Sequence, residues 1–312
     1  MAWDAFSLAR LVVGAGVLLY AVRSDVLTRR VTDTCWWLFL GAGLIILEAQ
    51  LIFEGEEAIY LLAPFCFAVF FISLWFEGEV MGDHVKAMHG IAVAVMLNAA
   101  AIPVYLVLAT KGAGIGDEAG LRRLQLLSVP LMMLLAYGLY RTQLLSGGAD
   151  AKAFLSLAVL VPFYPAPLFD PLGIPLVFLV ICPFVLAVFF NAAFFTLLNP
   201  LGLGVYNLSR GDAGRLMFFA YKLPIQDARS RKFIWLSESQ KKGKRLYHYF
   251  KFRGQTSKWK RKQLDKFEKA GERKVWVQPQ IPFMVQLAAG FIFTYLFGNI
   301  ILFGIIKVFA GV

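Results

Sequence analysis

The chain has 312 residues, of which 59% are hydrophobic and only 16% are charged, and its formal net charge is +11. Soluble domains are about half apolar and about a quarter charged, so this composition and a mean hydropathy of +0.66 exclude a water-soluble fold for most of the chain. The sequence predicts an all-α polytopic membrane protein.

Eight apolar stretches are long enough to be considered as membrane spans, because a bilayer core about 30 Å thick needs roughly 20 apolar residues of helix. They are residues 6–23, 36–53, 58–76, 87–109, 124–142, 153–169, 174–198 and 282–308. The first stretch runs into Arg23 without a small-residue cleavage pattern, so no cleavable signal peptide is expected. Pro162, Pro165 and Pro167 interrupt the sixth, which predicts a short or kinked span.

Positive charge is concentrated in residues 204–280, which hold 20 Lys and Arg against 6 Asp and Glu. We therefore expect a transmembrane domain over residues 1–203, a soluble basic domain over residues 204–280 and a C-terminal transmembrane helix over residues 281–312. Runs of β-branched and aromatic residues bounded by turn formers predict a few short strands in the basic domain. The stretch SKWKRKQLDKFEKAG predicts a short basic helix, so the insertion is expected to be a small α+β domain.

The distribution of Lys and Arg predicts the orientation in the membrane, because cytoplasmic loops carry the excess of these residues. The basic insertion is the strongest indication and is expected in the cytoplasm. The connections after the first, third and fifth spans are then cytoplasmic too, and both termini lie outside. The fourth connection runs against the rule, because it carries Lys111, Arg122 and Arg123.

Two aspartates lie beside predicted spans on the cytoplasmic side: Asp25 at the end of the first span and Asp150 just before the sixth. Ionisable groups near lipid are costly and are often functional. Two carboxylates in one low-dielectric site cannot both ionise easily. The charged one can activate a water while the protonated one polarises a carbonyl, so this pair would suit the chemistry of an aspartic protease.

The residues around these aspartates have functional and structural interpretations. Gly147 and Gly148 would let the backbone turn sharply and a substrate chain approach closely. Asp150, after these two glycines, could instead cap the next helix, and Asp25 could be a solvated charge near Arg29. Lys152 and Arg29 could orient the carboxylates, or anchor helix ends to lipid phosphates.

Two motifs resemble the archaeal preflagellin and prepilin peptidases of the type IV prepilin peptidase family. They are SDVLTRRVTD followed by tryptophans, and GGADAK before an apolar helix that ends in FYP. The family has an aspartate near the end of its first helix and a GxGD motif; here alanine occupies the third position of that motif. The C-terminal segment that starts KVWVQPQIPF is also similar to the archaeal branch. The resemblance implies that Asp25 and Asp150 are the catalytic pair, with Gly147, Gly148, Lys152 and Arg29 as the motif and supporting residues.

Residues 114–117 read Gly-Ile-Gly-Asp and match GxGD literally. They follow the fourth predicted span, which places Asp117 on the opposite side of the membrane from Asp25. Two residues separated by a bilayer cannot form a catalytic pair, so Asp117 is interpreted as a loop residue.

The resemblance implies a substrate as well as a reaction. Family members cut flagellin or type IV pilin-like precursors after a glycine, between a short basic leader and the apolar helix that follows. Glu77, Glu79 and Asp83 form an acidic cluster that could attract such a leader, although a solvated loop explains them equally well. Bacterial relatives often add an N-methyltransferase function with a cysteine-rich loop, and the lack of CxxC pairs here predicts peptidase activity alone.

No cofactor or metal is expected, because Cys35, Cys66 and Cys182 lie far apart and the three histidines form no HExxH pattern. The basic insertion interleaves cations with aromatic residues, a pattern that could bind nucleic acid. Next to a membrane, anionic lipid headgroups are the expected partner, and no nucleic acid is expected.

The alternative function is an ion- or proton-coupled transporter that uses Asp25 and Asp150 as ion sites. That function predicts inverted repeats or helices broken at the midplane, and the sequence shows no clear repeat.

Overall fold

The computed structural model describes residues 4–79, 118–142, 145, 147–165, 167–169, 182–241, 244–249 and 255–310. The chain divides into two compact units, the first formed by Met1–Ala193 with Phe283–Val312 and the second by Phe194–Pro282. The structure is mostly helical with a small sheet region, which confirms the predicted helical membrane protein with a few strands.

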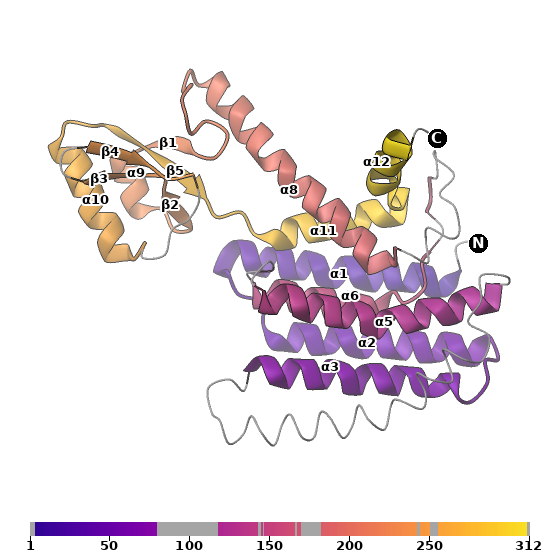
Figure 1. The fold of residues 1–312 in the computed structure, drawn as a ribbon. Coiled ribbons are helices and arrows are strands. Elements are labelled where there is room, and N and C mark those ends of the chain that lie inside the picture. Colours follow the sequence, from indigo (N-terminus) through magenta and orange to yellow (C-terminus); the bar gives the residue numbers. More distant parts are fainter. Residues whose placement is uncertain are drawn as a thin grey trace. The chain divides into compact units, whose positions relative to one another are not determined.

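The first unit is a bundle in which helices α1, α2, α3, α5 and α6 lie side by side with nearly parallel axes (Figure 1). Helix α2 packs against α6 and α1, and α6 also packs against α5. The elements are α1 (Ala5–Thr28), α2 (Asp33–Phe53), the 3-10 turn η1 (Tyr60–Leu62), α3 (Ala63–Glu79), α5 (Glu118–Arg141), α6 (Gly148–Leu160), the start of α8 (Phe184–Ser209), α11 (Phe283–Phe297) and α12 (Ile300–Ala310).

Four described helices are long and apolar enough to cross a membrane: Ala5–Thr28, Asp33–Phe53, Gly120–Arg141 and Phe184–Ser209. A fifth span is possible if α11 and α12, which are bent by 68° at their junction, act together. The described residues therefore do not confirm the predicted count of eight, and the predicted span 87–109 lies outside them.

The sixth predicted span, 153–169, is helical only to Leu160. Val161 precedes Pro162 and leaves the helical region, with φ −123° and ψ 70°. A proline disfavours the helical conformation of the residue before it, so α6 ends there with only 13 residues. That length is too short for a helix to cross the hydrocarbon core.

Glycines set the closest helix contacts of the bundle. A Cβ atom on Gly43 of α2 would lie 3.0 Å from the backbone N and Cα atoms of Leu160 in α6. A Cβ atom on Gly290 of α11 would lie 2.8 Å from the carbonyl oxygen of Val188 in α8. Small residues let membrane helices approach closely enough for backbone packing, and here they bring α6 and α11 against their neighbours.

Ion pairs join the connection after α2 to the start of α5. Arg122 pairs with Glu54, and Arg123 Nη2 lies 3.9 Å from Glu56 Oε2. These pairs offset the positive charge of the two arginines that ran against the predicted orientation. Acidic residues after α2 thus compensate the positive charge at the start of α5. The prediction of orientation counts Lys and Arg in each loop separately and does not include such pairs.

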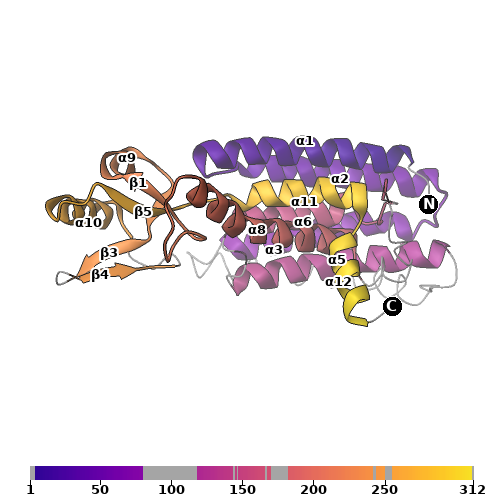
Figure 2. The same ribbon diagram turned by 90° about the horizontal axis from the view of Figure 1, so that it is seen from above.

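The second unit contains the end of α8, a three-stranded antiparallel sheet, a separate hairpin and two short helices (Figure 2). The sheet order is β1-β5-β2, and β3 pairs with β4. The elements are β1 (Tyr221–Pro224), α9 (Ile225–Ser230), β2 (Ile234–Leu236), β3 (Glu238–Lys241), β4 (Lys244–Tyr247), α10 (Ser257–Lys269) and β5 (Lys274–Pro279).

A small apolar core lies between the sheet and its helices. Its buried members come from β1, α9, β2, α10 and β5: Leu223, Ile225, Ala228, Ile234, Leu236, Leu264, Phe267, Val275 and Val277. The predicted basic helix is α10, which buries Leu264 and Phe267 against the sheet and keeps most of its lysines toward solvent.

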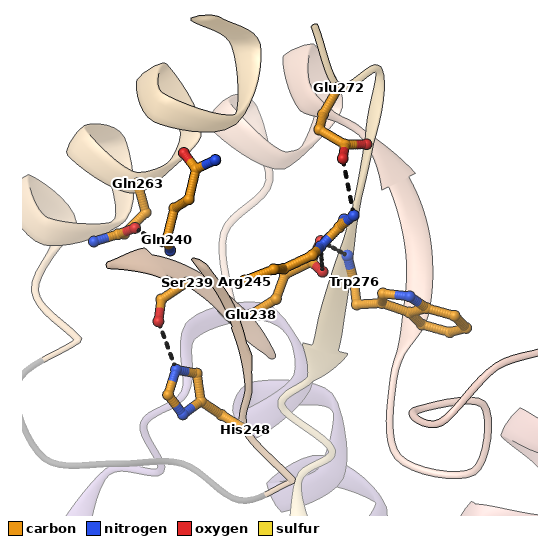
Figure 3. Close-up of polar contacts among 8 residues, drawn as sticks. All are labelled: Glu238, Ser239, Gln240, Arg245, His248, Gln263, Glu272 and Trp276. Atoms are coloured by element: carbon orange, nitrogen blue, oxygen red, sulfur yellow. Dashed lines mark hydrogen bonds and ion pairs between the residues drawn. The ribbon is translucent and has the colours of Figure 1, made fainter. Parts of the chain in front are cut away.

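A buried ion pair joins the hairpin to β5 (Figure 3). Glu238 is 0% exposed and accepts two hydrogen bonds from Arg245, at 2.6 and 2.9 Å, and a third from the backbone N–H of Trp276 at 2.8 Å. Arg245 also bonds Glu272 at 2.9 Å. A buried carboxylate is tolerated when it is paired and hydrogen-bonded, and this network meets both conditions.

Candidate functional site

Asp25 lies in the last turn of α1, where hydroxyl groups hold the chain as it leaves the helix. The N–H of Arg29, which adopts a left-handed conformation with φ 57°, donates to the carbonyl of Asp25 at 2.9 Å. Ser24 Oγ and Thr28 Oγ1 donate to the carbonyl of Arg30 at 2.7 and 3.0 Å. The local fold therefore determines the position of Asp25 at the end of the helix.

Asp150 lies in the first turn of α6, with its carboxylate folded back over Gly147. A Cβ atom on Gly147 would lie 2.9 Å from Asp150 Cγ and would collide with Oδ2. The missing side chain of Gly147 thus leaves room for the carboxylate.

The structure brings the two aspartates together at neighbouring helix ends. Both side chains are half-buried, and the negative charge of Asp25 acts on Asp150. The positive charge of Arg29 acts in turn on Asp25. Two carboxylates in one low-dielectric site repel each other when both are ionised.

Asp33 is a neighbour of the site that was not predicted from the sequence. It lies at the start of α2, and its Oδ1 atom is 2.6 Å from Nζ of Lys152 in α6. This ion pair joins the start of α2 to the first turns of α6, close to Asp150. Two features of the sequence could have indicated this ion pair: Asp33 ends the SDVLTRRVTD motif, and Lys152 follows Asp150 by two residues.

Of the other predicted site residues, Gly148 lies beside the aspartates, whereas the side chains of the acidic cluster lie outside the described part of the chain. A Cβ atom on Gly148 would lie 3.8 Å from the hydroxyl of Tyr140, so α5 borders the site. Glu77 and Glu79 lie in the last turn of α3, and their side chains are outside the described structure, as are Asp83 and residues 114–117. Within the described residues, no group of three or more His, Cys, Asp and Glu side chains could hold a metal ion.

Comparisons with known proteins bear on both parts of the chain. Residues 214–300 match the family model described as Archaeal Peptidase A24 C-terminus Type II. The preflagellin peptidase of Methanocaldococcus jannaschii is 28% identical over 169 residues, which are 52% of this chain and 67% of that protein. The preflagellin peptidases of Methanococcus maripaludis and Methanococcus voltae are 26% and 29% identical over 163 residues, 50% of this chain and 65% of each protein.

The chain is a relative of the archaeal preflagellin peptidases. This relationship confirms the family resemblance predicted from the two aspartate motifs. The aligned segments span about two thirds of the curated relatives. The family model covers most of the basic segment together with α11.

Proposed function

We propose that the chain is a membrane aspartyl endopeptidase that removes the short basic leader from archaeal flagellin or type IV pilin-like precursors. The observation that carries the proposal is the electrostatic interaction between Asp25 and Asp150, which come from distant parts of the chain and meet at neighbouring helix ends. The similarity to preflagellin peptidases supports a peptidase and provides no support for a transporter.

The proposed reaction uses one carboxyl group in each protonation state. The ionised aspartate removes a proton from a water molecule as the water attacks the scissile carbonyl carbon. The protonated aspartate donates a hydrogen bond to the carbonyl oxygen as negative charge develops on it. Proton transfer to the departing amine then breaks the carbon–nitrogen bond and leaves a carboxylate on the leader.

Neighbouring residues support the pair by holding it in place. The open space at Gly147 admits the carboxylate of Asp150, and the ion pair between Lys152 and Asp33 joins the α6 segment that follows Asp150 to α2. The charge of Arg29 acts on Asp25. A fixed scaffold of this kind matters because small displacements of reacting groups slow reactions strongly.

The proposed substrate binds with its basic leader near the acidic residues after α3, namely Glu77, Glu79 and Asp83. The bond cut lies between this leader and the following apolar helix, after a glycine. The site and the basic insertion are placed on the cytoplasmic face of the cell membrane, because Lys and Arg mark that side. Anionic lipids are the proposed partner of the basic insertion. The proposed reaction uses no cofactor.

The test is cleavage of a flagellin-like precursor by membranes that contain the wild-type chain, Asp25→Asn, Asp150→Asn or Asp117→Asn. We expect the first two variants to lose activity by about 10²- to 10⁴-fold and Asp117→Asn to match the wild type. Equal amounts of each chain in the membrane fraction, with equal elution in detergent, control for folding. Full activity of Asp150→Asn would remove the proposal.

A further inference from the structure

A cavity of about 750 Å³ in the second unit is lined by cations and carries no acidic residue in its wall. It lies between the segment that follows α9, strand β2 and the first turns of α10. Its cationic wall residues are Arg229, Arg231, Lys232, Lys260 and Arg261. Such a volume is in the range of small-molecule sites.

The five cations of the cavity wall differ in whether a carboxylate offsets their charge. Arg229 is offset by Asp265 and Glu268, each 2.6 Å from its Nη2 atom. Among the described residues, the other four cations of the cavity form no ion pair with a carboxylate. The cavity therefore holds excess positive charge that a bound anion would offset.

The N-terminal end of α10 adds to this positive field. Thr256 caps the helix by accepting the N–H of Trp259 at 3.2 Å, and Thr256 and Ser257 both line the cavity. The first turn of α10 contains no acidic residue, although carboxylates are favoured there by the helix dipole. Free N–H groups at such an end bind phosphate groups readily.

Specific contacts hold this wall in place. The side-chain amide of Gln255 makes two hydrogen bonds with the backbone of Leu236, at 3.0 and 2.9 Å, and so anchors the start of α10 to β2. Lys260 Nζ donates to the carbonyl of Arg231 at 3.1 Å. Burial lowers the pKa of Lys260, and an anion nearby would favour its charged form.

The backbone of the cavity wall is strained at one residue. Phe233 has φ 57°, a left-handed conformation that bulky residues rarely adopt, and its carbonyl accepts the N–H of Gln280 at 3.0 Å. Both residues line the cavity. Strain of this kind is typical of ligand sites.

The positive charge of the cavity would repel the basic leader of the proposed substrate and would attract an anion. The apolar helix α11 begins at Phe283, only three residues after Gln280 of the cavity wall. The anion present at a membrane surface at high concentration is the phosphodiester of an acidic lipid. We propose that this cavity binds the phosphate of an anionic glycerophospholipid headgroup, a role that is independent of the peptidase chemistry.

The test measures binding of short-chain phosphatidylglycerol to the full-length protein in a neutral detergent, with short-chain phosphatidylcholine, which is zwitterionic and has no net charge, as the comparison. The cavity variant is Lys260→Gln with Arg261→Gln. The matched control is Lys241→Gln with Lys244→Gln, which removes the same charge from exposed positions of the β3–β4 hairpin outside the cavity. We expect saturable one-to-one binding that weakens roughly tenfold or more in the cavity variant and less than about twofold in the control.

Equal weakening in both variants would show diffuse attraction to the basic surface and would overturn the proposal. Inorganic phosphate that binds as tightly as phosphatidylglycerol would assign the cavity to a soluble phosphate instead. A single-stranded oligonucleotide that displaces the lipid at lower concentration would indicate nucleic acid. Cleavage of precursor by the same preparations is recorded separately, so loss of lipid binding with normal cleavage leaves the peptidase proposal intact.

Discussion

The two units of the chain are stabilised by different contacts. The helical unit relies on apolar packing with close backbone contacts at glycines such as Gly43 and Gly290. The basic unit has a core of only a few apolar side chains and adds the buried pair of Glu238 and Arg245. In lipid the hydrophobic effect does not drive helices together, so close van der Waals packing holds them. In water, a small hydrophobic core gains stability from additional hydrogen bonds and ion pairs.

This difference also explains where chemistry can occur in each unit. Asp25 and Asp150 are half-buried at helix ends, where the charge of Arg29 acts on Asp25 and the charge of Asp25 acts on Asp150. A carboxylate that is already bonded to a guanidinium and a backbone N–H is poorly available for proton transfer. The paired carboxylate of Glu238 is therefore structural, whereas Asp25 and Asp150 are the carboxylates of the proposed reaction.

The largest expected effect on stability concerns the buried pair. Arg245→Met leaves the carboxylate of Glu238 in the interior without its cation, which costs about 3–5 kcal/mol. Hydrogen exchange of the β3 and β5 amides in the full-length protein measures this decrease in the free energy of unfolding. The control, Arg229→Met, removes a cation whose partners are exposed and should cost about 1 kcal/mol or less. Equal costs would contradict the distinction between the two ion pairs.

Glycine packing in the helical unit gives an intermediate effect. Gly43→Ala places a methyl group 3.0 Å from the backbone of Leu160, and the shift of α6 should cost about 1–3 kcal/mol. Gly41→Ala lies on the same helix and meets nothing within 4 Å, so its thermal midpoint in detergent should equal or exceed that of the wild type. Two equal midpoints would show that the contact at Gly43 is unimportant.

The smallest expected effect on stability, and the most specific effect on activity, concerns the glycines before Asp150. Gly147→Ala displaces the carboxylate of Asp150, so kcat/KM for precursor cleavage should fall by about ten- to a hundredfold with little change in thermal midpoint. Gly148→Ala meets only the hydroxyl of Tyr140 at 3.8 Å and should stay within about twofold. Loss of activity in both variants alike would mean that backbone freedom, rather than space for the carboxylate, is the requirement at this position.

Several features could be predicted from the sequence because they depend on local composition or on motifs. Apolar stretches predicted the long helices α1, α2, α5 and α8, and the charge of residues 204–280 marked a segment of different character. The prolines of the sixth span predicted a short or kinked helix, and α6 does end early, at Leu160, because Pro162 restricts the residue before it. The motifs around Asp25 and Asp150 indicated the family, which the comparisons confirmed.

The sequence by itself determined that this protein needs lipid as a solvent and that its two aspartates lie at helix ends, since hydropathy and residue order are properties of the chain. Only the tertiary structure decided which charges meet. It paired Lys152 with Asp33 and Arg122 with Glu54, and it placed Arg231 and Lys232 in the same cavity wall as Lys260 and Arg261. Electrostatic interactions depend on distance and burial rather than on separation along the chain, so helix packing had to be known before any of these groups could be given a partner.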